Sequence, residues 1–219
     1  PALAGFLILL VDTAGVFFMV SAIYVFSAIS IAMVNYSPAR NDDAKKSVTA
    51  DIRDGLTYAF SEPILRALFI MTFIPVLFGF SYYALIPAWA REALNMQSDG
   101  LGILLMLMGV GATVGTIGLA ALGNLRRRGI VMLSTSAAWG IALAIFSQMS
   151  SFPLAVPFLI FIGLTSSVYM SMNMTMIQLN SDQKMRGRVM SISMMTFGMM
   201  PLSAVPFGTI TQQIGTPDA

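Results

Sequence analysis

The sequence contains no cysteine and no histidine among its 219 residues. Without these side chains it cannot build a zinc site of the usual kind, nor a Ser-His or Cys-His catalytic pair. Charged residues are also scarce, at 10% of the chain, whereas an ordinary soluble domain has about 25%. We therefore expect no catalytic residue, no metal site and no cofactor.

Apolar residues are abundant instead: 57% of the chain is hydrophobic, and its mean hydropathy is +0.79. A bilayer is crossed by roughly 20 residues of helix. Runs of at least that length occupy residues 15–35, 64–88, 100–122, 130–150, 153–180 and 189–212. Lipid offers the backbone no hydrogen bonds, so these runs must be helices. The sequence predicts an all-α polytopic membrane protein.

The first eleven residues are also apolar and look like the end of a further span. The chain begins with Pro1, and no charged segment precedes this apolar piece, so it does not have the pattern of a signal peptide. We expect the chain to be an internal piece of a longer protein.

The basic residues are distributed unevenly over the gaps between the runs. If the gaps alternate between two faces, residues 36–63, 123–129 and 181–188 share one face. With the adjoining helix end, that face holds eleven of the twelve basic residues, namely Arg40, Lys45, Lys46, Arg53, Arg66, Arg126, Arg127, Arg128, Lys184, Arg186 and Arg188. The other face holds only Arg91. Basic residues gather in cytoplasmic loops, so we predict that these gaps are cytoplasmic.

Three of these residues, Arg126, Arg127 and Arg128, are consecutive. Burying them in lipid would cost about 3 kcal/mol each, so they pin their hairpin to the cytoplasm. Nucleic-acid or phosphate binding is the rival interpretation. Apolar helices on both sides disfavour it, so we expect contact with membrane lipid and no nucleic-acid partner. Together with Arg186 and Arg188, the triplet supplies our candidates for cytoplasmic loop or gating residues.

The longest polar segment, residues 36–63, predicts a linker. Its second half carries Ile52, Leu56, Ala59 and Phe60 at helical spacing, which is typical of an amphipathic helix at a membrane surface. We therefore divide the chain into three parts. Residues 1–35 end one bundle, residues 36–63 form the linker, and residues 64–219 form a second bundle of five spans.

The third run carries Gly111, Gly115 and Gly118 on one helical face. Small residues at such spacing allow a second helix to approach closely. Plain packing between neighbours is the simpler interpretation, and a sliding surface during a conformational change is the alternative.

The fifth run carries two polar stripes. One face carries Ser166, Tyr169, Asn173 and Asn180, and a neighbouring face carries Ser167, Ser171, Thr175 and Gln178. Polar groups that face lipid are costly, so the stripes should face protein or water. Hydrogen bonding between helices is one explanation, and a solvated substrate cavity is the other. We select the cavity, because two stripes exceed what one packed interface needs. Tyr82, near the outer end of the second run, fits an interfacial aromatic belt and is also a cavity candidate.

Prolines interrupt two of the runs, at Pro75 and Pro87 in the second and at Pro201 and Pro206 in the sixth. A proline removes a backbone donor and bends its helix. Such bends are common in membrane helices, but interrupted helices also frame the binding sites and hinges of transporters.

Several segments resemble one known family. "DIRDGLTYAFSEPILRALF" is similar to the junction between the linker and the seventh helix of the major facilitator superfamily, in its enterobactin-exporter-like branch of drug and siderophore efflux proteins. "YYALIPAWAREAL", "DQKMRGRVMS" and "PALAGFLILL" resemble later and earlier parts of the same branch. In the loop that holds the arginine triplet, this sequence has Asn124 and lacks the aspartate of the superfamily's loop motif.

The resemblance implies that the six runs are helices six to eleven of twelve, preceded by part of the fifth. It also implies a rocker-switch exporter of small molecules, completed by a missing amino-terminal half. Its cavity would be lined by the seventh and tenth helices, which are the second and fifth runs. The competing classes are a membrane protease, which would need an acid pair or a Ser-His pair within the spans, and a polytopic subunit that transports nothing.

Overall fold

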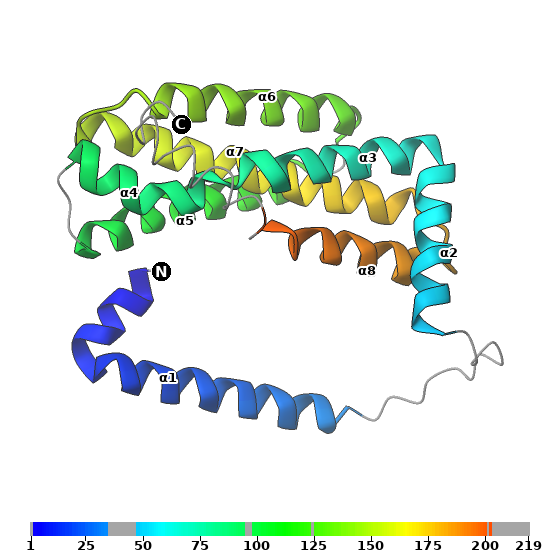
Figure 1. Cartoon of the computed structure of the whole chain (residues 1–219), viewed down its shortest axis with the longest axis horizontal. Coiled ribbons are helices and arrows are strands. Elements are labelled where there is room, and N and C mark those ends of the chain that lie inside the picture. Colours follow the sequence, from blue (N-terminus) through cyan, green and yellow to red (C-terminus); the bar gives the residue numbers. More distant parts are fainter. Residues whose placement is uncertain (1, 35–46, 95–97, 124, 201, 203–219) are drawn as a thin grey trace. The chain divides into compact units, whose positions relative to one another are not determined.

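The structure is a computed structural model that describes residues 2–34, 47–94, 98–123, 125–200 and 202. The described elements are α1 (Ala2–Ala32), α2 (Val48–Ser61), α3 (Pro63–Ile74), the π-helical turn η1 (Pro75–Gly79), α4 (Tyr82–Leu94), α5 (Ser98–Ala121), α6 (Arg128–Phe146), α7 (Phe152–Leu179) and α8 (Arg186–Phe197). The described residues contain no strand (Figure 1). The all-α membrane fold predicted from hydropathy is therefore confirmed.

Five stretches of the described chain are long and apolar enough to cross a membrane: Ala14–Ala32, Pro63–Arg91, Leu101–Ala121, Arg128–Phe146 and Phe152–Leu179. They coincide with the first five predicted runs to within a few residues. Of the sixth run, the part up to Met200 and Leu202 is described, and the rest lies outside the described residues.

The chain divides into two compact units, residues 1–46 and residues 47–219. The first unit contains α1, which is one unbroken helix, although the sequence predicted separate spans within it. Figure 1 shows this helix bent in its first third. A Cβ added to Gly15 would lie 2.8 Å from the Cβ of Val11, one turn earlier. The missing side chain at Gly15 leaves room for Val11 one turn earlier, and the helix continues through this point.

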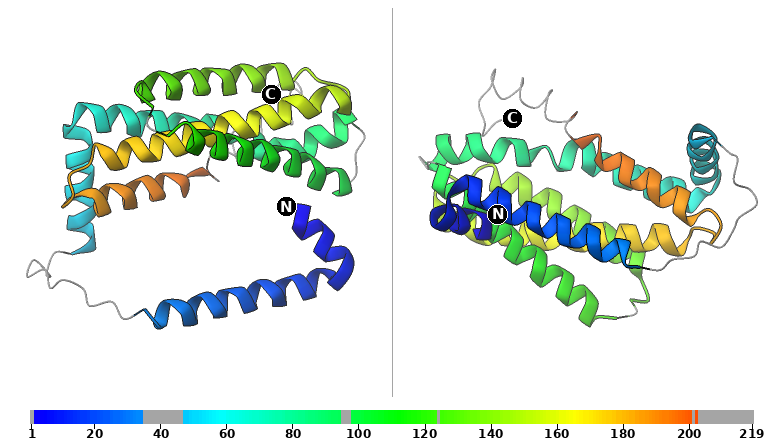
Figure 2. Two further views of the ribbon diagram at one scale, coloured as in Figure 1. Left: turned by 180° about the vertical axis from the view of Figure 1, so that it is seen from behind. Right: turned by 90° about the horizontal axis from the view of Figure 1, so that it is seen from below.

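The second unit is built around α7, which packs against α5 and α6 (Figure 2). Its helices are apolar almost all round, as expected for helices that face both lipid and protein. The fully buried aliphatic side chains include members from α3, α5, α7 and α8: Leu65, Leu104, Leu159, Ile162, Ile177 and Val189.

The amphipathic helix predicted in the linker is α2, and it belongs to the second unit. Ser47 caps its first turn, because its hydroxyl oxygen accepts a hydrogen bond from the amide of Ala50 at 3.2 Å. Figures 1 and 2 show α2 lying crosswise at one end of α3, α7 and α8. This orientation suits a helix at a membrane surface.

The second span is interrupted at Pro75. After Ile74 the helix widens into η1, and the amide of Phe80 donates to the carbonyl of Pro75, five residues earlier, at 2.8 Å. π-Helical turns of this kind are rare and occur frequently at functional sites.

Candidate transport site

The first polar stripe of α7 faces α3. Asn173 is 2% exposed, and its Oδ1 lies 3.1 Å from the hydroxyl of Thr72, which is itself buried. The amide nitrogen of Asn173 donates to the carbonyl of Leu68 at 3.4 Å. The Thr72 hydroxyl also lies 2.9 Å from that carbonyl, so its single proton is shared between two acceptors. Asn173 thus links α7 to α3 by hydrogen bonds, and these are the two spans that were expected to line the cavity.

Tyr169, one turn before Asn173, makes a second hydrogen bond between α7 and α3. Its hydroxyl donates to the carbonyl of Met71 on α3, and the residue is 1% exposed. In a regular helix, the carbonyl of Met71 would accept from the residue four positions later. That residue is Pro75, which has no N–H. The tyrosine hydroxyl therefore donates the hydrogen bond to the Met71 carbonyl that Pro75 cannot donate.

Ser166 is 7% exposed and donates within its own helix, to the carbonyl of Gly163 at 3.2 Å. The first residue of the second stripe faces α5: the hydroxyl of Ser167 donates to the carbonyl of Ala112 at 3.0 Å. Gln178 lies exposed near the far end of α7 and is not brought together with the other candidates. In this conformation Ser166, Ser167, Tyr169 and Asn173 all bond to neighbouring helices or to their own backbone.

Tyr82 is connected to Tyr169 of the stripe by ring contacts through Trp139. Its ring lies edge-on to Trp139 with centroids 6.4 Å apart, and Trp139 in turn lies 6.1 Å from Tyr169. Phe80 and Tyr83 complete the cluster. The hydroxyl of Tyr82 and the indole nitrogen of Trp139 are shielded from solvent and have no hydrogen-bond partner among the described atoms. Such groups are uncommon in native interiors.

Sequence reasoning missed Thr72, Trp139 and the Met71 carbonyl. Thr72 and Trp139 are single residues within long apolar runs, so no pattern distinguishes them. Pro75 was the available signal for Met71, because an interior proline always deprives the carbonyl four residues earlier.

The packing glycines lie where α5 crosses α7. A Cβ added to Gly111 would lie 1.8 Å from the carbonyl oxygen of Ile160, and one added to Gly115 would lie 2.7 Å from that of Leu164. From the other side, a Cβ on Gly163 would lie 2.0 Å from the oxygen of Met108. The two backbones are in direct contact. An added Cβ on Gly118 meets nothing within 4 Å, so this glycine takes no part in the contact.

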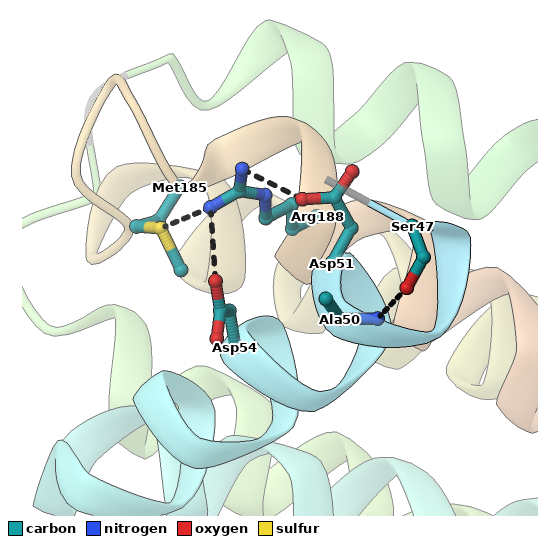
Figure 3. Close-up of polar contacts among 6 residues, drawn as sticks. All are labelled: Ser47, Ala50, Asp51, Asp54, Met185 and Arg188. Carbon is teal, nitrogen blue, oxygen red and sulfur yellow. Dashed lines mark hydrogen bonds and ion pairs between the residues drawn. The ribbon is translucent and has the colours of Figure 1, made fainter. Parts of the chain in front are cut away.

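Arg188, at the start of α8, binds the linker helix α2 (Figure 3). Its Nη2 lies 2.7 Å from Oδ1 of Asp51, and its Nη1 lies 3.9 Å from Oδ2 of Asp54. The Asp51 oxygen is shielded from solvent but makes no aligned hydrogen bond, so the pair interacts as two charges. The guanidinium also donates to the sulfur of Met185 at 3.5 Å. Because these side chains are one-third or more exposed, the attraction is screened and modest.

Packing supports this ion pair. A Cβ added to Gly55 would lie 2.7 Å from Cδ1 of Ile192 on α8 and 3.2 Å from the Cβ of Arg188. The amide of Asp182 donates to the hydroxyl of Tyr58 at 3.1 Å. The linker helix is therefore attached to the second bundle by backbone proximity, a hydrogen bond and charge.

Comparison with known proteins now decides the family. The model of the Major Facilitator Superfamily matches residues 1–205. The chain belongs to this superfamily. It is 22% identical over 214 residues to the multidrug efflux pump Tap of Mycolicibacterium fortuitum, a match that covers 96% of this chain and 51% of the pump. It is 27% identical over 209 residues to the staphyloferrin A transporter of Staphylococcus aureus, covering 94% and 51%. The chain thus spans about half the length of these curated relatives, and no solved structure matches it.

The superfamily resemblance predicted from the sequence is confirmed, and with it the chain's place among integral membrane proteins. Arg126 and Arg127 lie in the loop between α5 and α6, and Arg128 is the first residue of α6. Arg126, Arg127 and Arg128 line a shallow hollow with the end of α7, including Met176 and Asn180. Asn124, where the superfamily motif has its aspartate, lies outside the described residues.

The remaining gating candidate, Arg186, donates to the carbonyl of Ser181 at 3.4 Å and thereby closes the turn between α7 and α8. The five predicted arginines thus occupy three separate settings: the α5–α6 loop, the α7–α8 turn and the contact with α2. Nowhere in the described ranges do three acidic side chains gather as a metal ion would require.

Proposed function

We propose that this chain is part of a secondary active transporter that exports small amphipathic compounds or siderophores by rocker-switch alternating access. The observation that carries the proposal is the contact between α7 and the interrupted span α3–η1–α4. The two spans expected to line the cavity meet through polar groups at Thr72 and Asn173, and one of them is broken by a π turn. Interrupted helices and midplane polar residues frame the binding sites of many transporters.

The family and the printed names of both relatives support a transporter rather than an enzyme. The proposal includes an amino-terminal half that completes the cavity, a small-molecule substrate, and a bacterial plasma membrane with the basic loops in the cytoplasm. That orientation rests on the eleven-to-one distribution of basic residues.

Ser166, Tyr169, Asn173, Gln178 and Tyr82 are the proposed cavity residues. In the described conformation Tyr169 and Asn173 are bonded to α3. We propose that they meet substrate or cavity water when α3 and α7 move apart during transport. The unpartnered donors of Tyr82 and Trp139 lie beside this contact and offer hydrogen bonds to a ligand in the same step.

The alternative is a polytopic membrane subunit that transports nothing. The experiment expresses the complete transporter containing this chain in an efflux-deficient bacterium. It measures the accumulation of a fluorescent amphipathic cation and of a ferric siderophore, before and after the proton gradient is collapsed. We expect lower accumulation than with an empty vector for at least one compound. Unchanged accumulation of both, with the protein present in the membrane, would favour the subunit.

A further inference from the structure

The turn η1 differs from an α-helix in its hydrogen bonding. The amide of Phe80 donates to the carbonyl of Pro75, five residues earlier, at 2.8 Å. In an α-helix the same amide would donate to the carbonyl of Val76, four residues earlier. The turn from Pro75 to Gly79 therefore holds one residue more than an α-helical turn would. A change of acceptor, from residue 75 to residue 76, separates the π form of this turn from an α form.

A side chain from another helix packs against this turn. Trp139 of α6 is 3% exposed. A Cβ added to Gly79 would lie 3.0 Å from Cη2 and 3.5 Å from Cζ2 of its indole ring. The same Cβ would lie 3.3 Å from the Cβ of Pro75. The backbone of Gly79 thus lies between the indole and the proline, and this close approach depends on the missing side chain.

Trp139 also contacts the residues that follow the turn. Its ring centroid lies 5.1 Å from that of Phe80 and 6.4 Å from that of Tyr82, the first residue of α4. Aromatic pairs at such distances attract each other. The indole therefore packs on both the end of the π turn and the start of α4.

The position of Trp139 has an unfavourable side as well. Its indole N–H is shielded from solvent and finds no acceptor among the described atoms. A buried donor without an acceptor costs free energy. The present arrangement is thus favoured by apolar packing and opposed by an unmet hydrogen bond, so a competing form of the turn has less to overcome.

A change of the turn from π to α would rotate α4. Each residue of an α-helix advances the chain by about 100° around the axis and about 1.5 Å along it. If the extra residue joins the helix, everything after Gly79 turns by about 100° while α3 stays in place. Tyr82, a proposed cavity residue, would then leave Trp139.

We propose that Trp139 is a positioning residue for transport: it holds η1 in the π form, and the second span passes between π and α forms of this turn during the transport cycle. In the π form Tyr82 lies against Trp139, and in the α form it lies about 100° away around the helix axis. The proposal rests on the proposed function in assigning this change to a transport cycle. It differs from rigid-body rocking of two halves, in which α3 and α4 keep their relative rotation.

The test follows the rotation with pairs of spin labels, whose distances are measured by pulsed electron paramagnetic resonance. It uses the complete transporter with any cysteines outside this chain replaced, because the chain itself has none. One label stands at Ala137 on α6 and the other at Ala84 or Leu85 on α4. These two positions lie about 100° apart around the helix, so a rotation changes at least one distance. A label at Ala67 on α3, before the turn, replaces the α4 label as the internal reference.

Two variants remove the hold of Trp139. Trp139→Leu takes away most of the indole, and Gly79→Ala keeps it but adds a methyl group against which it would press. In both we expect a distance from α4 to Ala137 to shift by up to about 8 Å, while the distance from Ala67 stays the same. Gly79→Ala decides alone if Trp139→Leu does not fold. Gly140→Ala is the control and should change no distance, because its Cβ would meet nothing within 4 Å.

Deletion of Leu77 removes the extra residue, so the turn can become α without rotating α4. In the Trp139→Leu background the deletion should restore the original distances, which mere loosening of the fold would not do. If the proposed function holds, the deletion alone should lower the maximal rate of efflux at least about fivefold, with little change in KM, because the turn can no longer alternate.

Unchanged α4 distances in both variants, a shift that includes Ala67, or no restoration by the deletion would overturn the proposal. Normal efflux after the deletion would also overturn it, because the turn would then play no part in the cycle. If the unaltered protein exports nothing, the proposed function fails, and the label distances still decide whether Trp139 holds the turn.

Discussion

The hydroxyl of Tyr169 on α7 donates to the carbonyl of Met71 on α3, the carbonyl that lies four residues before Pro75. A proline that interrupts a membrane helix leaves such a carbonyl to find its donor elsewhere. In this chain the donor comes from the helix that also supplies Asn173. The interruption of one span and the polar face of another are therefore parts of a single arrangement.

This arrangement predicts that the effect of Tyr169→Phe depends on Pro75. In the unaltered chain, Tyr169→Phe should lower the free energy of unfolding by about 1 kcal/mol, because a buried carbonyl loses its donor. In a Pro75→Ala background, the alanine supplies a backbone N–H to the same carbonyl, so the loss should shrink. Unfolding in mixed detergent micelles, followed by circular dichroism, compares the unaltered chain, the two single variants and the double variant. An equal loss in both backgrounds would show that the two residues act independently.

The hydrogen bonds of Asn173 to α3 predict that its replacement changes transport by the complete transporter. Asn173→Leu should impair efflux while membrane insertion stays normal, because leucine supplies neither the acceptor for Thr72 nor the donor for Leu68. Thr72→Val is the matched control: it removes the same contact from α3 but leaves the Asn173 amide available to substrate. We expect Asn173→Leu to be the more damaging change. Efflux of every tested compound at the normal rate after Asn173→Leu would mean that the polar stripe of α7 serves only helix packing.

The crossing of α5 and α7 predicts opposite effects for two glycines of one helix. Gly111→Ala should destabilise the chain by about 1–3 kcal/mol, because its Cβ would meet backbone that cannot move aside. Gly118→Ala should be neutral or stabilising by up to about 1 kcal/mol, since alanine favours helix and the space is open. Thermal unfolding in detergent distinguishes them. A Gly111→Ala protein as stable as Gly118→Ala would mean that the two helices do not touch there.

Much of the fold was predictable because hydropathy is summed over whole helices. The first five spans and the amphipathic α2 are each defined by many residues, so single exceptions do not obscure them. The unbroken α1 was not predicted, since the helix continues through Asp12 and Thr13, where the sequence suggested a break between two spans. A hydropathy profile does not distinguish a bent helix from two helices.

The candidate site was predictable only in part, for a physical reason. Helical periodicity shows that Tyr169 and Asn173 share a face, but their partners depend on how α7 is rotated toward α3. Thr72 and the Met71 carbonyl carry no periodic signal, so the sequence left open whether the stripe meets water or a helix. Gly163 was missed for the same reason, because its contact with Met108 depends on where two helices cross.

The predicted orientation is testable because the chain has no cysteine of its own. Single cysteines at Gln183 and Gln148, which are both exposed, lie at opposite ends of the membrane helices in the predicted topology. A membrane-impermeant maleimide added to intact cells should label Gln148→Cys and leave Gln183→Cys unlabelled until the cells are opened. The reverse pattern would invert the assignment of the basic loops.

The final prediction concerns Arg188 and Asp51, which hold α2 to α8. Because both side chains are one-third or more exposed, the pair should contribute only about 0.2–1 kcal/mol in a double-mutant cycle of Arg188→Gln and Asp51→Asn. Screening should reduce that coupling as salt is raised from about 0.1 M to about 1 M. Hydrogen exchange should accelerate within α2 in either variant, because the helix opens more readily when its charge contact is lost. Arg186→Gln is the matched control, since Arg186 bonds the α7–α8 turn and not α2.

The close packing at Gly55 should hold α2 more strongly than the ion pair does, because a side chain added there would push against Ile192 and the Cβ of Arg188. Gly55→Val should therefore release α2 more than either charge change, and hydrogen exchange within α2 should accelerate further. Gly55→Val keeps both charges in the chain but also pushes against Arg188, so the contribution of the ion pair is taken from Arg188→Gln and not from this variant. If Arg188→Gln leaves exchange within α2 unchanged at low salt, while Gly55→Val accelerates it, packing alone attaches the linker helix and the ion pair is incidental.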